Sequence, residues 1–162
     1  MRYFIKTVFF IIIGFVMVFF GSSSVLSQKS DMGGWEIDGE YNKNFNADEF
    51  DSFRGNIVGI TKVVPLPGMS PGIALLLGIA GGEVITVHVC PLWFENPGNI
   101  GVRNGDRVKV RGAWAEINGE EVFMLSKLKK GNDFEYKVRL TKDGTPLWTM
   151  PPEELERERN SE

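Results

Sequence analysis

A histidine and a cysteine two positions apart are the side chains of this sequence with the most evident chemistry. His88 and Cys90 are the only histidine and the only cysteine among the 162 residues, and both lie in the stretch VHVCPLWFENPG, residues 87–98. Imidazole nitrogen and thiolate sulfur bind zinc and copper. Alternate residues of a strand share one face, so both side chains are expected to point together, away from the apolar face of residues 85–89. The pair is a candidate metal or redox site.

The number of available ligands argues against such a site. A stable metal centre takes three or four ligands. With no other histidine or cysteine, the remaining ligands would be carboxylates or a methionine such as Met124 or Met150. The Cys-x-x-Cys-His motif of c-type haem is absent. A packed cysteine beside a surface histidine is therefore favoured, and no cofactor is expected. The alternative for the single thiol is a reaction with another chain.

Catalytic arrangements find little support in the sequence. Residues two apart on a strand have Cβ atoms about 6.5–7 Å apart, so direct contact between the Cys90 nucleophile and the His88 base is not favoured. Glu120 and Glu121 are neighbours on a strand and face opposite ways, which makes them a poor acid and base pair. No glycine loop for phosphate is followed by a helix. The sequence therefore predicts a protein that is not an enzyme.

Two aromatic residues follow the histidine and the cysteine. Proline cannot donate to a strand ladder, so Pro91 should end its strand, and Trp93 is expected to fold back and plug the open end of a barrel. Buried aromatic residues dominate small cores. The alternative is that Trp93, with Phe94 beside it, forms the aromatic wall of a binding pocket.

Basic residues supply the other candidate site, a strip for an anionic partner. Between residues 103 and 142 there are ten basic and six acidic residues, whereas residues 28–53 contain seven acidic and two basic residues. Alternation along a strand places basic side chains on a common face, and such a strip suits an anionic polymer, lipid headgroups or an acidic partner. The alternative is a solvated polar face. The candidate binding residues are Trp93, Phe94, Arg107, Lys109, Arg111, Lys137 and Arg139.

Six strand-like runs must position these residues. Three consecutive runs, a connector and a strong Asn118-Gly119 hairpin signal match an all-β fold, a small OB-like Greek-key barrel of five to six strands. A lipocalin-type barrel needs eight strands, which is more than the six runs of this sequence provide. An immunoglobulin-like sandwich is the alternative. The runs are residues 53–64, 73–80, 83–90, 107–117, 121–130 and 134–140.

Four motifs follow one another along this region. VHVCPLWF, VRNGDRVKVRGAW, NGEEVFMLSKLKKG and VRLTKDGTPLW contain a Pro-x-Trp turn, a Gly-Asp-x-Val strand, a hairpin and a Gly-x-Pro-x-Trp ending. Over residues 53–148 this order resembles a group of small secreted bacterial OB-fold-like proteins of unknown function. Cys90 departs from the pattern, in which glycine precedes the proline. The resemblance implies an OB-like fold and export, and it supplies no catalytic residue.

The N-terminus is typical of an export signal. Arg2 and Lys6 flank the start of an apolar run, and small residues lead to a predicted cleavage after Ser27. The run is short for a membrane span, which needs about 20 apolar residues, so an uncleaved membrane anchor over residues 4–21 is the alternative. The predicted division is a signal peptide (1–27), a polar linker that docks through Trp35 (28–47), the OB-like domain (48–148) and a charged tail (149–162).

Together these features predict an exported, non-catalytic binding module of the cell envelope, periplasmic or extracellular. Cleavage would leave 16 basic and 21 acidic residues, a net charge of −5, which is not the balance of a nucleic-acid-binding protein. An envelope protein or an anionic surface is the expected partner. The alternatives are a metal or redox protein centred on His88 and Cys90, and an OB-fold that binds single-stranded nucleic acid. The latter is disfavoured because the second and third strands carry no aromatic residue for base stacking.

Overall fold

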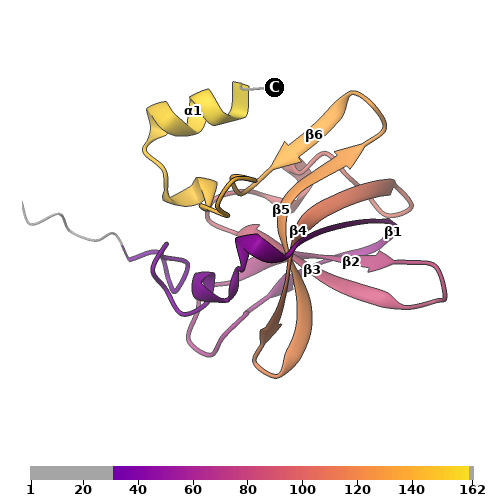
Figure 1. Ribbon diagram of the computed structural model, residues 1–162, viewed down its shortest axis with the longest axis horizontal. Coiled ribbons are helices and arrows are strands. Elements are labelled where there is room, and N and C mark those ends of the chain that lie inside the picture. Colours follow the sequence, from indigo (N-terminus) through magenta and orange to yellow (C-terminus); the bar gives the residue numbers. More distant parts are fainter. Residues whose placement is uncertain (1–30, 161–162) are drawn as a thin grey trace, which may run out of the picture.

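The described part of the chain forms a β-barrel with short helical segments around it. The computed structural model describes residues 31–160, so the predicted signal peptide or anchor lies outside the described residues. Figure 1 shows the strands crossing at the centre of the molecule, with the C-terminal helix standing apart from them. The strands are β1 (Phe50–Val63), β2 (Gly72–Gly78), β3 (Val84–Pro91), β4 (Arg107–Ile117), β5 (Glu120–Lys130) and β6 (Phe134–Lys137).

The strand pairing is that of an OB-fold. β1 pairs antiparallel with both β2 and β4, β2 pairs with β3, and β4 pairs with β5. A short parallel pairing of β3 with β5, at Val87↔Phe123 and His88↔Met124, closes the barrel. The closed order β1-β2-β3-β5-β4 is that of a five-stranded Greek-key barrel. It confirms the predicted OB-like fold and excludes the immunoglobulin-like sandwich.

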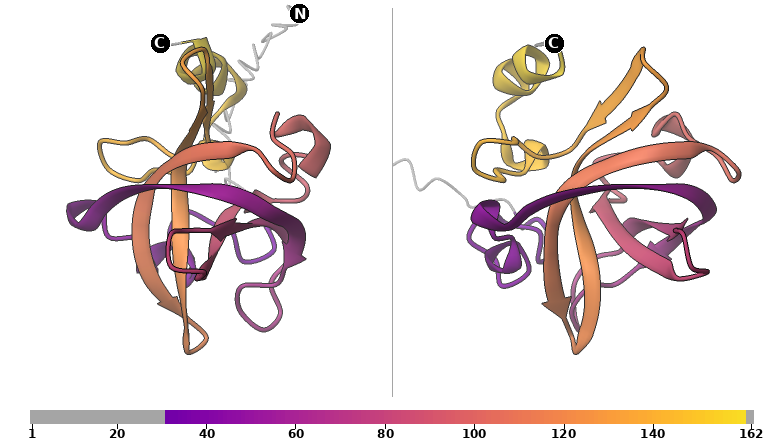
Figure 2. Two further views of the ribbon diagram at one scale, coloured as in Figure 1. Left: turned by 90° about the vertical axis from the view of Figure 1, so that its right-hand side faces the viewer. Right: turned by 45° about the vertical axis from the view of Figure 1, so that its right-hand side comes forward.

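Local sequence explains the bends and turns of the barrel. The register of β4 against β5 shifts between Arg111 and Gly112, and a Cβ atom at Gly112 would collide with the carbonyl oxygen of Met124. Only glycine therefore lets the two strands approach so closely at this bend. Asn118 and Gly119 both have positive φ, as the predicted two-residue hairpin requires. Figure 2 shows β4 and β5 curving around the barrel, while the β5–β6 hairpin projects from it.

The segment predicted to be a polar linker is part of the packed structure. Trp35 and Tyr41 are fully buried, and the Trp35 indole donates a hydrogen bond to the carbonyl oxygen of Ser70, 2.9 Å away. The expected docking of this arm through Trp35 is therefore present. Four 3-10 turns flank or connect the strands, and the second is capped by Asn46, whose side chain accepts a hydrogen bond from the amide of Asp48. The 3-10 turns around the barrel are η1 (Asn42–Asn44), η2 (Ala47–Glu49), η3 (Pro97–Asn99) and η4 (Leu147–Thr149).

The charged tail forms helix α1 (Pro152–Asn160), which has no fully buried residue. Glu153 and Glu154 lie in its first turn and Arg157 and Arg159 in its last, the arrangement that the helix dipole favours. Within residues 31–160, no helix has the length and hydrophobicity needed to cross a membrane.

Candidate functional site: a basic face on four strands

His88 and Cys90 are buried, contrary to the expectation that they face away from the core. The histidine is 3% exposed and the cysteine is fully buried. One face of β3 fills the barrel, and the N-terminal arm and β6 cover the other. His88 Nδ1 lies 3.3 Å from the hydroxyl of Tyr41, and Cys90 Sγ lies 3.9 Å from the hydroxyl of Tyr136. The prediction of a surface histidine was therefore wrong, and the prediction of a packed cysteine is confirmed.

Burial also makes both groups poor metal ligands and poor nucleophiles. Loss of hydration raises the pKa of the Cys90 thiol to about 12, so the thiolate that binds metal and attacks electrophiles is scarce at neutral pH. Burial and the nearby Arg139 charge lower the pKa of His88 to about 4. Among the described residues, no three His, Cys, Asp or Glu side chains gather as metal ligands would. Nothing in this geometry favours the metal or redox alternative.

Arg139 is also buried, and its assignment to the outward basic strip was wrong. It lies after the end of β6, is 1% exposed, and its guanidinium lies between the rings of Phe45 and Trp148, 4.9 and 4.7 Å from their centroids. It donates to Asn42 Oδ1 at 2.7 Å and to the carbonyl oxygen of Gly144 at 3.3 Å. Burial lowers the pKa of Arg139 to about 10, so the guanidinium remains a cation at neutral pH. It ties the N-terminal arm to the C-terminal segment.

Trp93 does not plug the barrel. It is 49% exposed, and its indole donates to the carbonyl oxygen of Met32 at 3.3 Å. Trp35 and Trp148 take the buried position, in edge contact with centroids 5.7 Å apart. Trp93 instead lines an open pocket of about 440 Å³ with Trp148 and Ser70. Phe94 beside it is half-buried, against Trp148.

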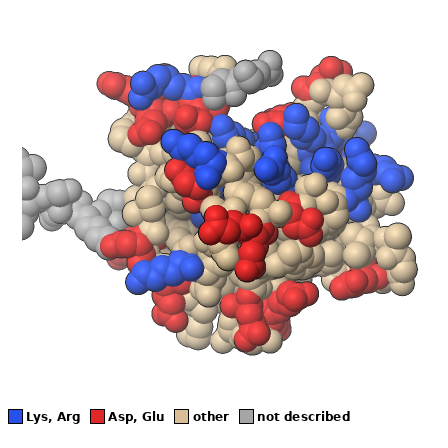
Figure 3. Space-filling view, viewed as in Figure 1, with Lys and Arg blue, Asp and Glu red and all other residues tan. Residues whose placement is uncertain are grey.

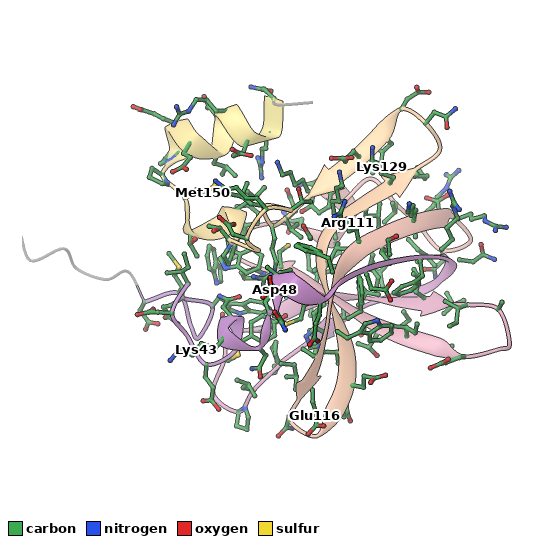
Figure 4. All side chains as sticks on the ribbon, viewed as in Figure 1. Lys43, Asp48, Arg111, Glu116, Lys129 and Met150 are labelled. Atoms are coloured by element: carbon green, nitrogen blue, oxygen red, sulfur yellow. The ribbon has the colours of Figure 1, made fainter. Side chains whose placement is uncertain are left out.

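The basic residues of the strands form a face that spans four strands. Arg107, Lys109 and Arg111 are all exposed and alternate with buried valines, as the sequence predicts for β4. Figure 3 shows a group of Lys and Arg side chains over the region of β4, β5 and β6, and acidic side chains around the C-terminal helix, at the centre and over the lower half of the view. In Figure 4, Arg111 lies near the middle of the view and Lys129 at the upper right, whereas Lys43 lies at the lower left, in the N-terminal arm. We define the basic face as Arg54, Arg107, Lys109, Arg111, Lys127, Lys129 and Lys137.

Strand register aligns these cations in two rows. One row runs through Arg111, Lys127 and Lys137, which are direct cross-strand partners. The other runs through Arg54, Lys109 and Lys129, and Arg107 extends it along β4. Like charges opposite one another are destabilising in a sheet. Cross-strand cations that no carboxylate neutralises, such as Arg54 and Lys109, therefore lower the stability of the sheet.

Carboxylates neutralise one end of the basic face. Glu135 lies 3.3 Å from Lys127 and 2.8 Å from Lys129, and Glu158 of α1 lies 2.9 Å from Lys137. Within the described residues, these are the ion pairs of the face, and they involve β5 and β6. Among the same residues, the cations of β1 and β4 have no carboxylate partner. The Arg111 guanidinium contacts an aromatic ring instead, 5.2 Å from the centroid of Phe50. The β1 and β4 end is the part available to a ligand.

A cleft adjoins the neutralised end of the basic face. It lies between α1 and the β5–β6 hairpin and has a volume of about 890 Å³. The helix is held across it by Lys137–Glu158 and by Arg159, whose guanidinium is 3.9 Å from Glu95 and 5.4 Å from the centroid of Phe94. The cleft lining includes Lys127, Lys129, Lys137, Glu135, Tyr136 and Glu158.

Sequence reasoning missed three contributors to this arrangement. Arg54 alternates with Ser52 and Asn56 on the exposed side of β1, a signal that the period of two could have supplied. Glu135 and Glu158 could not have been found in this way, because their pairing depends on the β5–β6 hairpin and on where α1 docks.

Comparisons with known proteins name a family. No curated protein matches this sequence significantly. Among solved structures, the Stn1-Ten1 complex from S. pombe is similar at 16% sequence identity and a TM-score of 0.41. That alignment covers 52% of this chain and 59% of the other, so it spans less than two thirds of that protein. A family description matches residues 49–135, from the turn before β1 to the start of β6. The chain belongs to the MamS/MamX magnetosome protein family.

Proposed function

We propose that this protein is an exported, non-catalytic binding module whose basic face binds an anionic surface of a partner in the cell envelope. The observation that carries the proposal is the register of the strands. It brings seven cations from β1, β4, β5 and β6 into two rows and leaves the β1 and β4 end without carboxylate partners among residues 31–160. Export is supported by the N-terminal sequence, with its charged start, apolar run and small-residue exit.

The remaining polar clusters do not support catalysis. His88 and Cys90 are enclosed, and their shifted pKa values keep the imidazole neutral and the thiol protonated near neutral pH. Arg139 is held by Asn42 and Gly144, and it lines neither the pocket beside Trp93 nor the cleft beside α1. These groups support the scaffold, whereas the basic face is open to solvent.

A paired charge reversal tests the proposal. The full chain and two variants would be titrated with poly-glutamate, with vesicles containing phosphatidylglycerol and with a single-stranded oligonucleotide, at low and at physiological salt. Arg107→Glu with Lys109→Glu removes the centre of the basic face. Lys43→Glu with Lys62→Glu is the matched control, because it makes the same change in net charge at exposed positions off the face.

We expect the face variant to lose at least tenfold in affinity for the preferred anion and the control to lose less than twofold. Binding of the parent protein should weaken as salt rises, since exposed charges are screened. Equal losses in both variants would reduce the effect to net charge, and absence of binding to all three probes would overturn the proposal.

A further inference from the structure

We infer that the basic face recognises an extended acidic peptide segment of a protein partner, with carboxylates at alternate positions. This inference rests on the proposed function and specifies the chemistry of its ligand. The contacts within the molecule, the spacing of the cations and the curvature of the strands support it.

Carboxylates are the anions that this face already holds. Glu135 and Glu158 pair with Lys127, Lys129 and Lys137 at distances of 2.8–3.3 Å. Glu158 is 21 residues away from Lys137 and reaches it from a separate helix. The pairing shows that a carboxylate brought in by another segment fits the β6 end of the face. A partner's carboxylates would make the same contact at the end that has none.

The spacing of the cations matches an extended peptide. Arg107, Lys109 and Arg111 are successive outward residues of β4, so their Cα atoms repeat about every 6.6–6.8 Å. Alternate side chains of any extended peptide repeat at the same interval. A peptide lying along β4 with an acidic residue at every second position can therefore place one carboxylate at each cation. Cross-strand partners are only about 4.7–4.9 Å apart, so the match holds along the strand and not across it.

Two features argue against the other macromolecular anions. Single-stranded nucleic acid binds through aromatic stacking platforms as well as charge. Phe50 is an aromatic residue of β1 that touches the face, with its ring centroid 5.2 Å from the Arg111 guanidinium, and it is partly buried. A single partly buried ring does not make a platform for successive bases. A lipid surface is flat, whereas β4 and β5 curve around the outside of the barrel, as Figure 2 shows. A narrow extended chain follows one strand of a curved sheet more readily than a plane covers several.

Two peptides of equal length and charge test the inference. The peptide (Glu-Ser)6 places six carboxylates on one side of an extended chain, and (Glu-Glu-Ser-Ser)3 divides the same six between two sides. Their affinities for the full chain would be measured by fluorescence anisotropy at physiological salt. We expect the alternating peptide to bind at least fivefold more tightly, and that preference to disappear in Arg107→Glu with Lys109→Glu.

The outcomes separate the inference from the function on which it rests. Equal binding of both peptides, with loss in the face variant, would overturn the alternating peptide while leaving an anion-binding face. Preference for anionic vesicles or for an oligonucleotide over both peptides would overturn it in favour of that ligand. Peptide binding unaffected by the face variant would overturn the proposed function itself.

Discussion

Trp35 and Trp93 differ in burial, so their truncation should differ in its effect on the stability of the protein. Trp35 is fully buried against Gly72, Tyr41 and Trp148, whereas Trp93 is half-exposed. Truncating a buried tryptophan typically costs about 3–5 kcal/mol of stability. We expect Trp35→Ala to lower the free energy of unfolding by that amount, and Trp93→Ala to lower it by less than about 1 kcal/mol. Guanidinium denaturation of the full chain measures both.

The comparison between the two tryptophan variants is its own control. A loss of several kcal/mol in Trp93→Ala would show that this side chain supports the barrel, as the sequence first suggested. A small effect in Trp35→Ala would contradict the role of the N-terminal arm as part of the folded unit.

At the scale of elements, α1 places a carboxylate on the basic face, where an anionic ligand would also bind. Glu158 lies 2.9 Å from Lys137, and the two side chains are 29% and 20% exposed. An ion pair that solvent reaches in this way contributes only about 0–1 kcal/mol. This ion pair therefore neutralises one cation of the face and contributes little to holding the helix, which Arg159 also contacts through Glu95 and Phe94. We expect Glu158→Gln to raise the affinity for poly-glutamate, which is long enough to span the face, by about twofold to fivefold, because Lys137 then loses the carboxylate that neutralises it.

Glu156→Gln is the matched control for that prediction. It makes the same charge change two residues away on α1, at an exposed position. Anisotropy titrations of both variants should show the gain only for Glu158→Gln. An equal gain in both variants would mean that the tail acts through its overall negative charge and not through this contact.

At the scale of the whole molecule, one buried cation joins segments from both ends of the chain. The Arg139 guanidinium bonds to Asn42 in the arm and to Gly144 near the C-terminal segment, and it stacks between Phe45 and Trp148. Lysine has a single nitrogen and no planar group, so it cannot replace both bonds and both ring contacts. We expect Arg139→Lys to lower the free energy of unfolding by about 1–3 kcal/mol.

Urea denaturation checks this against Arg103→Lys, a surface arginine whose side chain is 88% exposed. The control should change stability by less than about 0.5 kcal/mol. An Arg139→Lys variant as stable as the control would show that the arm and the C-terminal segment are held by apolar packing alone.

Much of the architecture was predictable because it depends on local spacing. Runs of alternating residues and turn residues such as Asn118-Gly119 identified the six strands to within a few residues. The same alternation correctly placed Arg107, Lys109 and Arg111 on the exposed side of β4. On that strand one face meets the barrel interior and the other meets solvent, so a period of two is sufficient to assign each side chain.

The sequence by itself determined the barrel and the cations of β4, whereas only the tertiary structure decided which other polar residues are exposed. His88 and Cys90 lie on the outer side of β3, and Arg139 lies beyond β6, so alternation placed all three away from the barrel core. Segments distant in sequence cover them instead: Tyr41 covers the histidine, Tyr136 the cysteine, and Asn42 and Trp148 the arginine. Alternation distinguishes the two faces of a strand, but it contains no information about what packs on the outer one. That depends on contacts between residues as much as 97 positions apart, as between Asn42 and Arg139.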